Sequence, residues 1–240
     1  MAGDGAAARA PQEVADTCDL VFLTVPDSAI AAVAAGVQWR AGQGVVHCSG
    51  ARGLEMLAHA AESGAMTGCF HPLQSFPSRD GDASRFNGVT CGVEAAGSLS
   101  AALERMAVDL GGHAVRLEGI DRAKYHAAAV FASNYVVSLM VAAERAWEQA
   151  GLPGEAARGA LAPLLLGASR NVAERALSEA LTGPVARGDV ATVGRQLAAL
   201  DEPALRELYR RLGAELLALD LGHSPEVAAR LRAILGATGQ

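Results

Sequence analysis

The stretch DLVFLTVPDSAIAAVAAGV, residues 19–37, decides the fold class. Its opening run, DLVFLTVP, is apolar and rich in β-branched side chains, which is typical of a strand that is covered on both faces. Asp27 and Ser28 follow, and both can cap a helix predicted over residues 28–37. A buried strand followed at once by a helix is the repeating unit of a parallel α/β sheet.

The same alternation continues through the first half of the chain. The runs GVVHCSG, AMTGCFHP, GVTCGVE and HAVRLEG begin at residues 44, 65, 88 and 113 and are predicted strands. Helices are predicted over about 52–63 and 97–110, and after about residue 120 only helical patterns follow. The sequence therefore predicts an α/β plus all-α protein, with a parallel, doubly wound sheet over 1–118 and a helical domain over 119–240.

Composition narrows the class of protein. The chain has 240 residues and a net charge of −6, which argues against a nucleic-acid partner. Its four cysteines form no CxxC pair and nothing resembles a cleaved signal, so we expect free thiols and a cytoplasmic location. The apolar stretch 127–143, within a long helix predicted over about 120–150, is at the short end for a membrane span and contains Ser133, Asn134 and Ser138. We therefore predict a buried core helix and no membrane partner.

The start of the chain differs from a complete nucleotide-binding fold. Such a fold places a glycine-rich phosphate-binding turn after its first strand. The only similar sequence is GDGAAA at residues 3–8, and the two residues before it cannot form a strand. We expect that either the fold binds no dinucleotide or its first strand–helix–strand unit is absent from this chain.

Five ordered motifs extend over nearly the whole chain, from about Glu13 to the C-terminus: DLVFLTVPDSAI, VVHCSGA, HPLQSF, YHAAAVFASNYVVSL and ALTGPVARGD. They resemble the bacterial family that joins a Rossmann-like domain to a C-terminal domain of unknown function 2520. That family is similar to the group of 6-phosphogluconate dehydrogenase, pyrroline-5-carboxylate reductase and prephenate dehydrogenase. The resemblance implies NADP or NAD as cofactor and hydride transfer with a small-molecule substrate. Family members open with a strand and a G-x-G-x-x-G turn, so we expect this chain to be N-terminally truncated and deficient in cofactor binding.

The turn HCSG after the second strand has several interpretations. Ser49 lacks the G-x-S-x-G spacing of a hydrolase nucleophile. The first two residues of the turn are adjacent in a strand and point to opposite faces, so we predict no metal site there. A structural interpretation is a tight turn in which Gly50 supplies backbone freedom. The metal site that we do not predict would have used His47, Cys48, Cys69 and His71 as its ligands.

The remaining interpretation is a cofactor and substrate cleft, because ligands of open α/β sheets lie beyond the carboxyl ends of the strands. In the related dehydrogenases, the loops after two such strands run beside the nicotinamide ribose. The resemblance therefore implies cofactor contacts from Thr24, Val25, Pro26, Ser49 and Gly50.

Four candidate catalytic residues follow from the third strand and the long helix. His71 lies in an HP motif that resembles prephenate dehydrogenases, where the histidine faces the substrate; a turn histidine is the alternative. On a continuous helix His126 and Ser133 point within about 20° of one direction, with Asn134 about 80° from His126. These groups either form a helix–helix network or face the cleft. Lys124 lies near the point where related enzymes often carry a catalytic lysine, and an exposed first-turn lysine is the alternative.

The motif ALTGPVARGD supplies the last cluster. Asp189 is placed to cap the helix that follows, whereas Arg187 has the planar guanidinium that suits a carboxylate or phosphate. We expect Thr182 and Arg187 to contact an anionic substrate across a homodimer. Two functions stay open, an NAD(P)-dependent oxidoreductase and a non-catalytic nucleotide- or metabolite-sensing protein.

Overall fold

The computed structural model describes residues 8–76 and 83–236. Contacts within the chain divide it into an N-terminal unit, Met1–Asn134, and a C-terminal unit, Tyr135–Gln240. The predicted boundary at residue 118 follows the last strand directly. The helix after that strand also contacts the sheet, so it belongs to the N-terminal unit. The predicted domain ranges stay a prediction.

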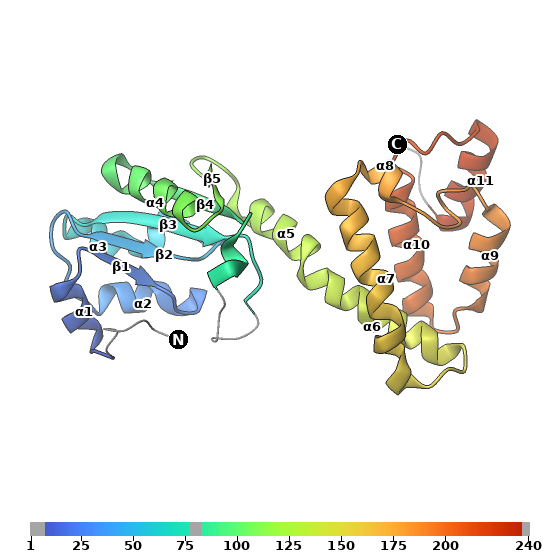
Figure 1. The fold of residues 1–240 in the computed structure, drawn as a ribbon, viewed down its shortest axis with the longest axis horizontal. Helices are drawn as coiled ribbons and strands as arrows, with labels where there is room; N and C mark the ends of the chain where they lie inside the picture. The colour runs from blue at the N-terminus through green and yellow to red at the C-terminus, as the bar shows by residue number, and fades with distance from the viewer. Residues whose placement is uncertain (1–7, 77–82, 237–240) are drawn as a thin grey trace. The chain divides into compact units, whose positions relative to one another are not determined.

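Strands and helices alternate in the N-terminal unit, as the apolar runs predict (Figure 1). Its elements are α1 (Pro11–Thr17), β1 (Leu20–Leu23), η1 (Asp27–Ala29), α2 (Ile30–Ala35), β2 (Gly44–His47), η2 (Leu54–Leu57), α3 (Ala58–Glu62), β3 (Met66–Pro72), η3 (Ala83–Phe86), β4 (Thr90–Ala95), α4 (Gly97–Asp109), β5 (His113–Arg116) and α5 (Arg122–Ala132).

The five strands form one sheet in the order β1-β2-β3-β4-β5. β1, β2 and β3 are parallel neighbours, and β4 is parallel to β5. The expectation of a wholly parallel sheet is wrong at one pair, because β3 and β4 are antiparallel, with Cys69 opposite Glu94 and His71 opposite Gly92. The described part of the connection between them contains only the short helix η3. An antiparallel pair needs no helical crossover, because the end of β3 and the start of β4 lie at the same edge of the sheet, where Pro72 is opposite Cys91.

Helices cover both faces of this sheet, with α4 on one side and α2 and α3 on the other (Figure 1). The consecutive residues Val45 and Val46 are both fully buried and belong to the two different apolar clusters. Neighbouring side chains of a strand point to opposite faces, so β2 is covered on both sides. The apolar pattern of this strand therefore correctly predicts that both faces of the sheet are covered.

The N-terminal edge of the described sheet is β1, which pairs only with β2 there. The sequence GDGAAA lies outside the described residues apart from Ala8. α1 precedes β1, and the Gln43 side chain donates hydrogen bonds of 2.7 Å to the carbonyls of Ala15 and Cys18 at its end. Arg40 donates to the same two carbonyls. The turn before β2 thus replaces the helical partners that these carbonyls lack.

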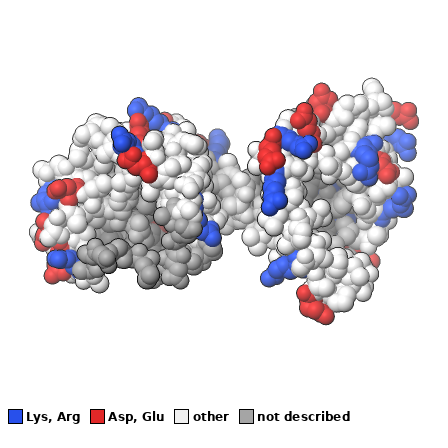
Figure 2. Space-filling model, in the orientation of Figure 1, with Lys and Arg blue, Asp and Glu red and all other residues white. Residues whose placement is uncertain are grey.

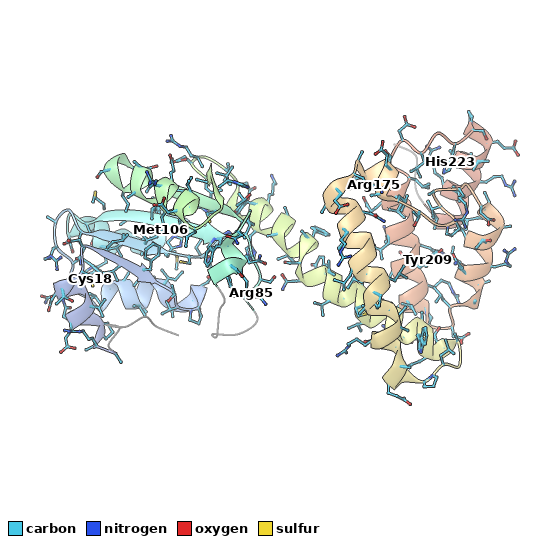
Figure 3. The ribbon with its side chains drawn as sticks, in the orientation of Figure 1. Cys18, Arg85, Met106, Arg175, Tyr209 and His223 are labelled. Carbon is cyan, nitrogen blue, oxygen red and sulfur yellow. The ribbon has the colours of Figure 1, made fainter. Side chains whose placement is uncertain are left out.

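The C-terminal unit has only helices among its described residues, as predicted. They are α6 (Asn134–Gln149), α7 (Gly154–Glu174), α8 (Leu177–Ala180), α9 (Val190–Ala199), α10 (Pro203–Leu216) and α11 (Pro225–Leu235). Buried side chains of α9 and α11, including Val193 and Leu231, form its core, and Tyr209 of α10 packs against it (Figure 3). Asp189 caps α9 as expected, because its carboxylate accepts a 3.0 Å hydrogen bond from Thr192 N–H.

The long helix expected over about 120–150 is two helices, α5 and α6, interrupted at Ser133. The Ser133 hydroxyl donates to Ala129 O at 2.6 Å and lies 3.0 Å from Asn134 Oδ1, so it competes with the backbone at the break. The expectation of a buried core helix is also wrong within one chain, since neither helix has a buried residue. The helical segment Arg122–Gln149 is long and apolar enough to cross a membrane. One such segment is only weak evidence for a membrane protein.

Figure 2 shows charged groups of both signs on one face of the molecule. On the face drawn in Figure 2, the described acidic and basic side chains lie interspersed on each unit. The absence of a nucleic-acid partner stays a prediction.

Candidate functional site

The carboxyl ends of β1, β2 and β3 lie at one edge of the sheet, as the sequence predicts for parallel neighbours. β4 begins at the same edge, because Cys91 is opposite Pro72. α5 reaches this region from the other end of β4 and β5 and brings polar side chains onto the sheet. This edge is the candidate site.

The turn after β2 is held by the hydroxyl of Ser49. Its Oγ donates a 2.7 Å hydrogen bond to Asp27 Oδ2 and accepts from the N–H groups of Ala51 and Arg52 at 3.2 and 3.1 Å. The hydroxyl is therefore fully engaged in joining the ends of β1 and β2. The expectation that Asp27 and Ser28 cap the next helix is wrong, since neither η1 nor α2 has a side-chain cap. Asp27 caps nothing because its carboxylate binds Ser49.

His47 is a structural residue of the same turn. Its ring is fully buried, with Nδ1 accepting from Ser49 N–H at 3.2 Å and Nε2 3.1 Å from Gly53 O. Because a carbonyl only accepts, Nε2 must carry the proton and donate. Burial lowers the pKa of His47, so the neutral ring clamps residues 49–53.

His71 occupies the end of β3 and faces α5. Its Nδ1 lies 2.9 Å from the Tyr125 hydroxyl, and the two rings meet edge to face with centroids 5.6 Å apart. The His126 ring lies 6.3 Å from the His71 ring. Burial, followed by the neighbouring His126 and Arg122, lowers the pKa of His71 to about 4, and burial raises the pKa of Tyr125 to about 12. Both groups are therefore neutral at neutral pH.

Two glycines leave the space that this pair occupies. A Cβ on Gly50 would lie 2.5–2.8 Å from three atoms of the His71 ring, and one on Gly92 would lie 2.6 Å from the Tyr125 hydroxyl. Side chains at these positions would displace the ring or the phenol. The φ of Gly50 is not positive, so the space for the His71 ring, and not the backbone freedom that the sequence suggests, requires glycine at this position.

A mostly buried ion pair lies beside this group. Arg122 of α5 binds the Glu94 carboxylate, with side-chain exposures of 11% and 22%. The guanidinium also lies 3.7 Å from Cys69 Sγ, whose thiol donates to Ser49 O at 3.3 Å. Burial raises the pKa of the Cys69 and Cys48 thiols to about 11, so neither is an activated nucleophile.

Within residues 8–76 and 83–236, no hydrogen bond or ion pair joins Thr24, Lys124 or Asn134 to this group. Thr24 and Pro26 are exposed after β1, with Val25 half-buried between them. Lys124 is exposed and pairs with Asp121, the N-cap of its own helix, at 3.2 Å. Asn134 begins α6 beyond the break, so the stripe that assumed one continuous helix ends at Ser133.

Thr182 and Arg187 are exposed in the C-terminal unit. Their loop is fixed from the α10–α11 connection, where His223 (Figure 3) donates from Nε2 to Val185 O at 2.8 Å. Gly188, with φ of 69°, passes close to the His223 ring. The loop is therefore anchored at Val185 by this hydrogen bond.

No group of three or more possible metal-ligating side chains occurs in residues 8–76 and 83–236.

Sequence reasoning missed Tyr125, Arg122 and Glu94. Arg122, Tyr125 and His126 are spaced i, i+3 and i+4, which places them on one face of a helix. That stripe begins in the first turn of α5. The predicted polar stripe extends from His126 toward the C-terminus of the helix, whereas the residues that contact the sheet lie toward its N-terminus.

Taken together, a mostly parallel sheet with polar strand ends and helices after it define a protein of the Rossmann-like class, and a model of the Rossmann-like domain matches residues 5–72. The chain belongs to the family of the domain of unknown function DUF2520, whose model matches residues 89–216. The resemblance of the five motifs is thereby confirmed.

Solved structures extend the comparison. A candidate NADP oxidoreductase from Bacteroides fragilis is 26% identical, with 82% of this chain and 74% of that chain covered and a TM-score of 0.64. A protein from Thermotoga maritima is 25% identical, with coverages of 90% and 78% and a TM-score of 0.61. The 1-pyrroline-5-carboxylate reductase of Streptococcus pyogenes, 15% identical with coverages of 94% and 79% and a TM-score of 0.53, shares the fold. Comparison with curated proteins found no match.

Proposed function

We propose that this protein is an NAD(P)-dependent oxidoreductase that transfers a hydride to or from a small anionic substrate. The observation that carries the proposal is the group formed by His71, Tyr125 and His126 beside Gly50, at the edge of the sheet where ligands of this fold class bind. The likeness to a candidate NADP oxidoreductase from Bacteroides fragilis supports the same reaction class.

The strand-end residues fit the nicotinamide end of such a cofactor. Thr24 and Pro26 are exposed at the end of β1, and Gly50 has no side chain to block the end of β2. We propose that Thr24, Val25, Pro26, Ser49 and Gly50 lie beside the nicotinamide ribose. A bound NAD(P)H supplies a hydride to an unsaturated carbon while a proton reaches the adjacent heteroatom, and oxidation removes both.

The remaining candidates contact the substrate in this proposal. His71 and His126 orient it or handle the proton, since imidazoles are suited to both roles. Arg187 and Thr182, exposed on a loop that His223 anchors at Val185, bind its anionic group. Lys124 and Asn134 stay candidates for further polar contacts.

We expect the 240-residue chain to bind NADPH or NADH weakly or not at all. The sequence has no G-x-G-x-x-G turn after a strand, and such a turn holds the pyrophosphate with backbone N–H groups and a helix N-terminus. Thermal-shift titration with each cofactor at up to millimolar concentration measures this directly. A shift at micromolar NADPH would contradict the expected deficiency and support the oxidoreductase assignment. No shift at millimolar concentration, even in a version extended to include such a turn, would count against that assignment.

A second candidate function is a sensor that binds a nucleotide or metabolite without converting it. The pKa values of about 4 for His71 and about 12 for Tyr125 favour it, because neither group exchanges protons readily near neutral pH. Saturable NADPH binding without hydride transfer to carbonyl or imine compounds would select the sensor. Turnover with any of them would exclude it.

We also propose that the protein is a homodimer through α6 and α7. Val137, Leu164, Leu166 and Val172 are 67%, 71%, 57% and 56% exposed, and α6 and α7 bury only Ala157. Apolar side chains on adjacent helices are typical of a surface that a second copy covers. Light scattering at micromolar concentration should give twice the chain mass, and Leu164→Glu should lower it. A clean monomer, or association only with lipid vesicles, would contradict the homodimer. The cytoplasmic location likewise stays a prediction.

A further inference from the structure

We propose that Tyr125 is a positioning residue that holds His71 as the neutral Nε2–H tautomer, so that His71 serves as a hydrogen-bond donor to a carbonyl, imine or carboxylate acceptor and not as a store of protons. The donation of a hydrogen bond from His71 to a substrate rests on the proposed function. The tautomer of His71 does not, because it is a property of the chain itself.

The direction of the hydrogen bond follows from basicity. A phenol and a neutral imidazole 2.9 Å apart could each donate. The imidazole nitrogen is much the stronger base and the phenol hydroxyl the stronger acid, so the Tyr125 O–H donates and Nδ1 of His71 accepts. The single proton of the neutral ring then lies on Nε2.

The surroundings keep the ring neutral. On α5 they include Arg122 and His126, whose positive or potentially positive charges oppose an imidazolium, and from β2 His47 adds to this. Asp27 at the end of β1 acts in the opposite direction but is a smaller influence than Arg122 or His126. Burial lowers the pKa of His71 further, to about 4 in all.

The position of Nε2 places its proton near the end of β2. A Cβ on Gly50 would lie 2.7 Å from Nε2, between the distances to Cε1 and Nδ1, so this nitrogen lies beside the backbone of the turn. No protein acceptor for Nε2 is found in residues 8–76 and 83–236, and no side-chain nitrogen or oxygen described there is both buried and unpartnered. Nε2 therefore keeps some solvent exposure, and in this proposal its N–H donates to a ligand at the turn.

A neutral donor of this kind polarises an acceptor without giving up its proton. If Nε2 lost its proton, the ring would become an anion unless Tyr125 ionised, and the pKa of Tyr125 is about 12. A neutral imidazole with a lowered pKa can act as such an electrophile in enzymes. The proton for the substrate must then come from another group or from water.

The test compares Tyr125→Phe with the unchanged chain by ¹⁵N NMR of the histidine rings, with His71 assigned by its loss in His71→Gln. In the unchanged chain we expect the Nε2–H pattern of His71 from pH 5 to 8. In Tyr125→Phe we expect mixed tautomers and a His71 pKa higher by about 0.5–1, as loss of one hydrogen bond to the neutral form predicts. Tyr209→Phe, which removes a phenol bonded to Gln196, should leave His71 unchanged.

An Nδ1–H tautomer in the unchanged chain would overturn the proposal even if Tyr125→Phe failed to fold. Identical tautomer and pKa in Tyr125→Phe would overturn it as well. No cofactor takes part in these spectra, so their outcome is independent of the NADPH titration. A failed tautomer test with clear NADPH binding would remove this role of Tyr125 and leave the oxidoreductase assignment intact.

Discussion

Arg122→Met is expected to destabilise the N-terminal unit by about 3–5 kcal/mol, the usual effect of removing one partner from a buried ion pair. The substitution keeps much of the apolar volume of the side chain but leaves the Glu94 carboxylate without its partner. Glu94 is mostly buried beside the Cys69 thiol, so water cannot replace the guanidinium fully. Urea unfolding followed by Trp39 fluorescence, in a Trp147→Phe background, measures the N-terminal unit alone because these are the two tryptophans of the chain.

A double-mutant cycle separates the ion pair from simple packing. Glu94→Leu combined with Arg122→Met removes both charges. The double variant should lose clearly less unfolding free energy than the sum of the losses in the two single variants. Arg105→Met removes the cation from an exposed i, i+4 pair with Asp109 and should change stability little. If Arg122→Met were as mild as Arg105→Met, Arg122 would contribute only as an exposed charge.

The strands of this fold could be predicted because their signal is local. The run GVV has consecutive apolar residues, as a strand with both faces buried requires, and Val45 and Val46 fill the two different clusters. The direction of β4 is not local information. It depends on whether residues 73–89 cross the sheet, and apolar patterning does not report that path.

The break at Ser133 shows a second limit. The apolar residues on both sides continue the helical pattern, so periodicity predicts one helix. The hydroxyl of Ser133 binds Ala129 O and adjoins the Asn134 side chain, a local competition that periodicity does not weigh. The sequence also does not predict that the apolar side chains of α6 are exposed within one chain. An apolar helix predicts burial, but the pattern does not say whether the same chain or a second molecule buries it.

The sequence predicts where the candidate site lies but not which side chains contact one another in it. Strand ends of a parallel sheet must meet, so His71 and Gly50 could be placed together from the sequence. The partner of His71 could not, because Tyr125 comes from 54 residues further along the chain and reaches His71 only when α5 packs on β3 and β4. The same packing brings Arg122 to Glu94.

The contact between Gly50 and His71 leads to the last prediction. Gly50 is buried and its φ is not positive, so alanine is compatible with the backbone there. The added methyl group would nevertheless lie 2.5–2.8 Å from Cε1, Nε2 and Nδ1 of His71, closer than nonbonded atoms approach. A shift of the ring would disturb its hydrogen bond from Nδ1 to Tyr125, whose hydroxyl itself lies against Gly92. The turn itself is fixed by Ser49.

Gly50→Ala is therefore expected to cost about 1–3 kcal/mol of unfolding free energy and to break the hydrogen bond between His71 and Tyr125. The matched control is Gly36→Ala at the end of α2, where φ is −82° and a Cβ meets its nearest neighbour, Ala32 O, at an ordinary 3.4 Å. It should be nearly neutral in the same urea unfolding experiment. ¹⁵N NMR of Gly50→Ala should show His71 with mixed tautomers, as in Tyr125→Phe. A variant as stable as Gly36→Ala that kept the Nε2–H tautomer would mean that the ring can shift and still bind Tyr125, and Gly50 would then not position His71.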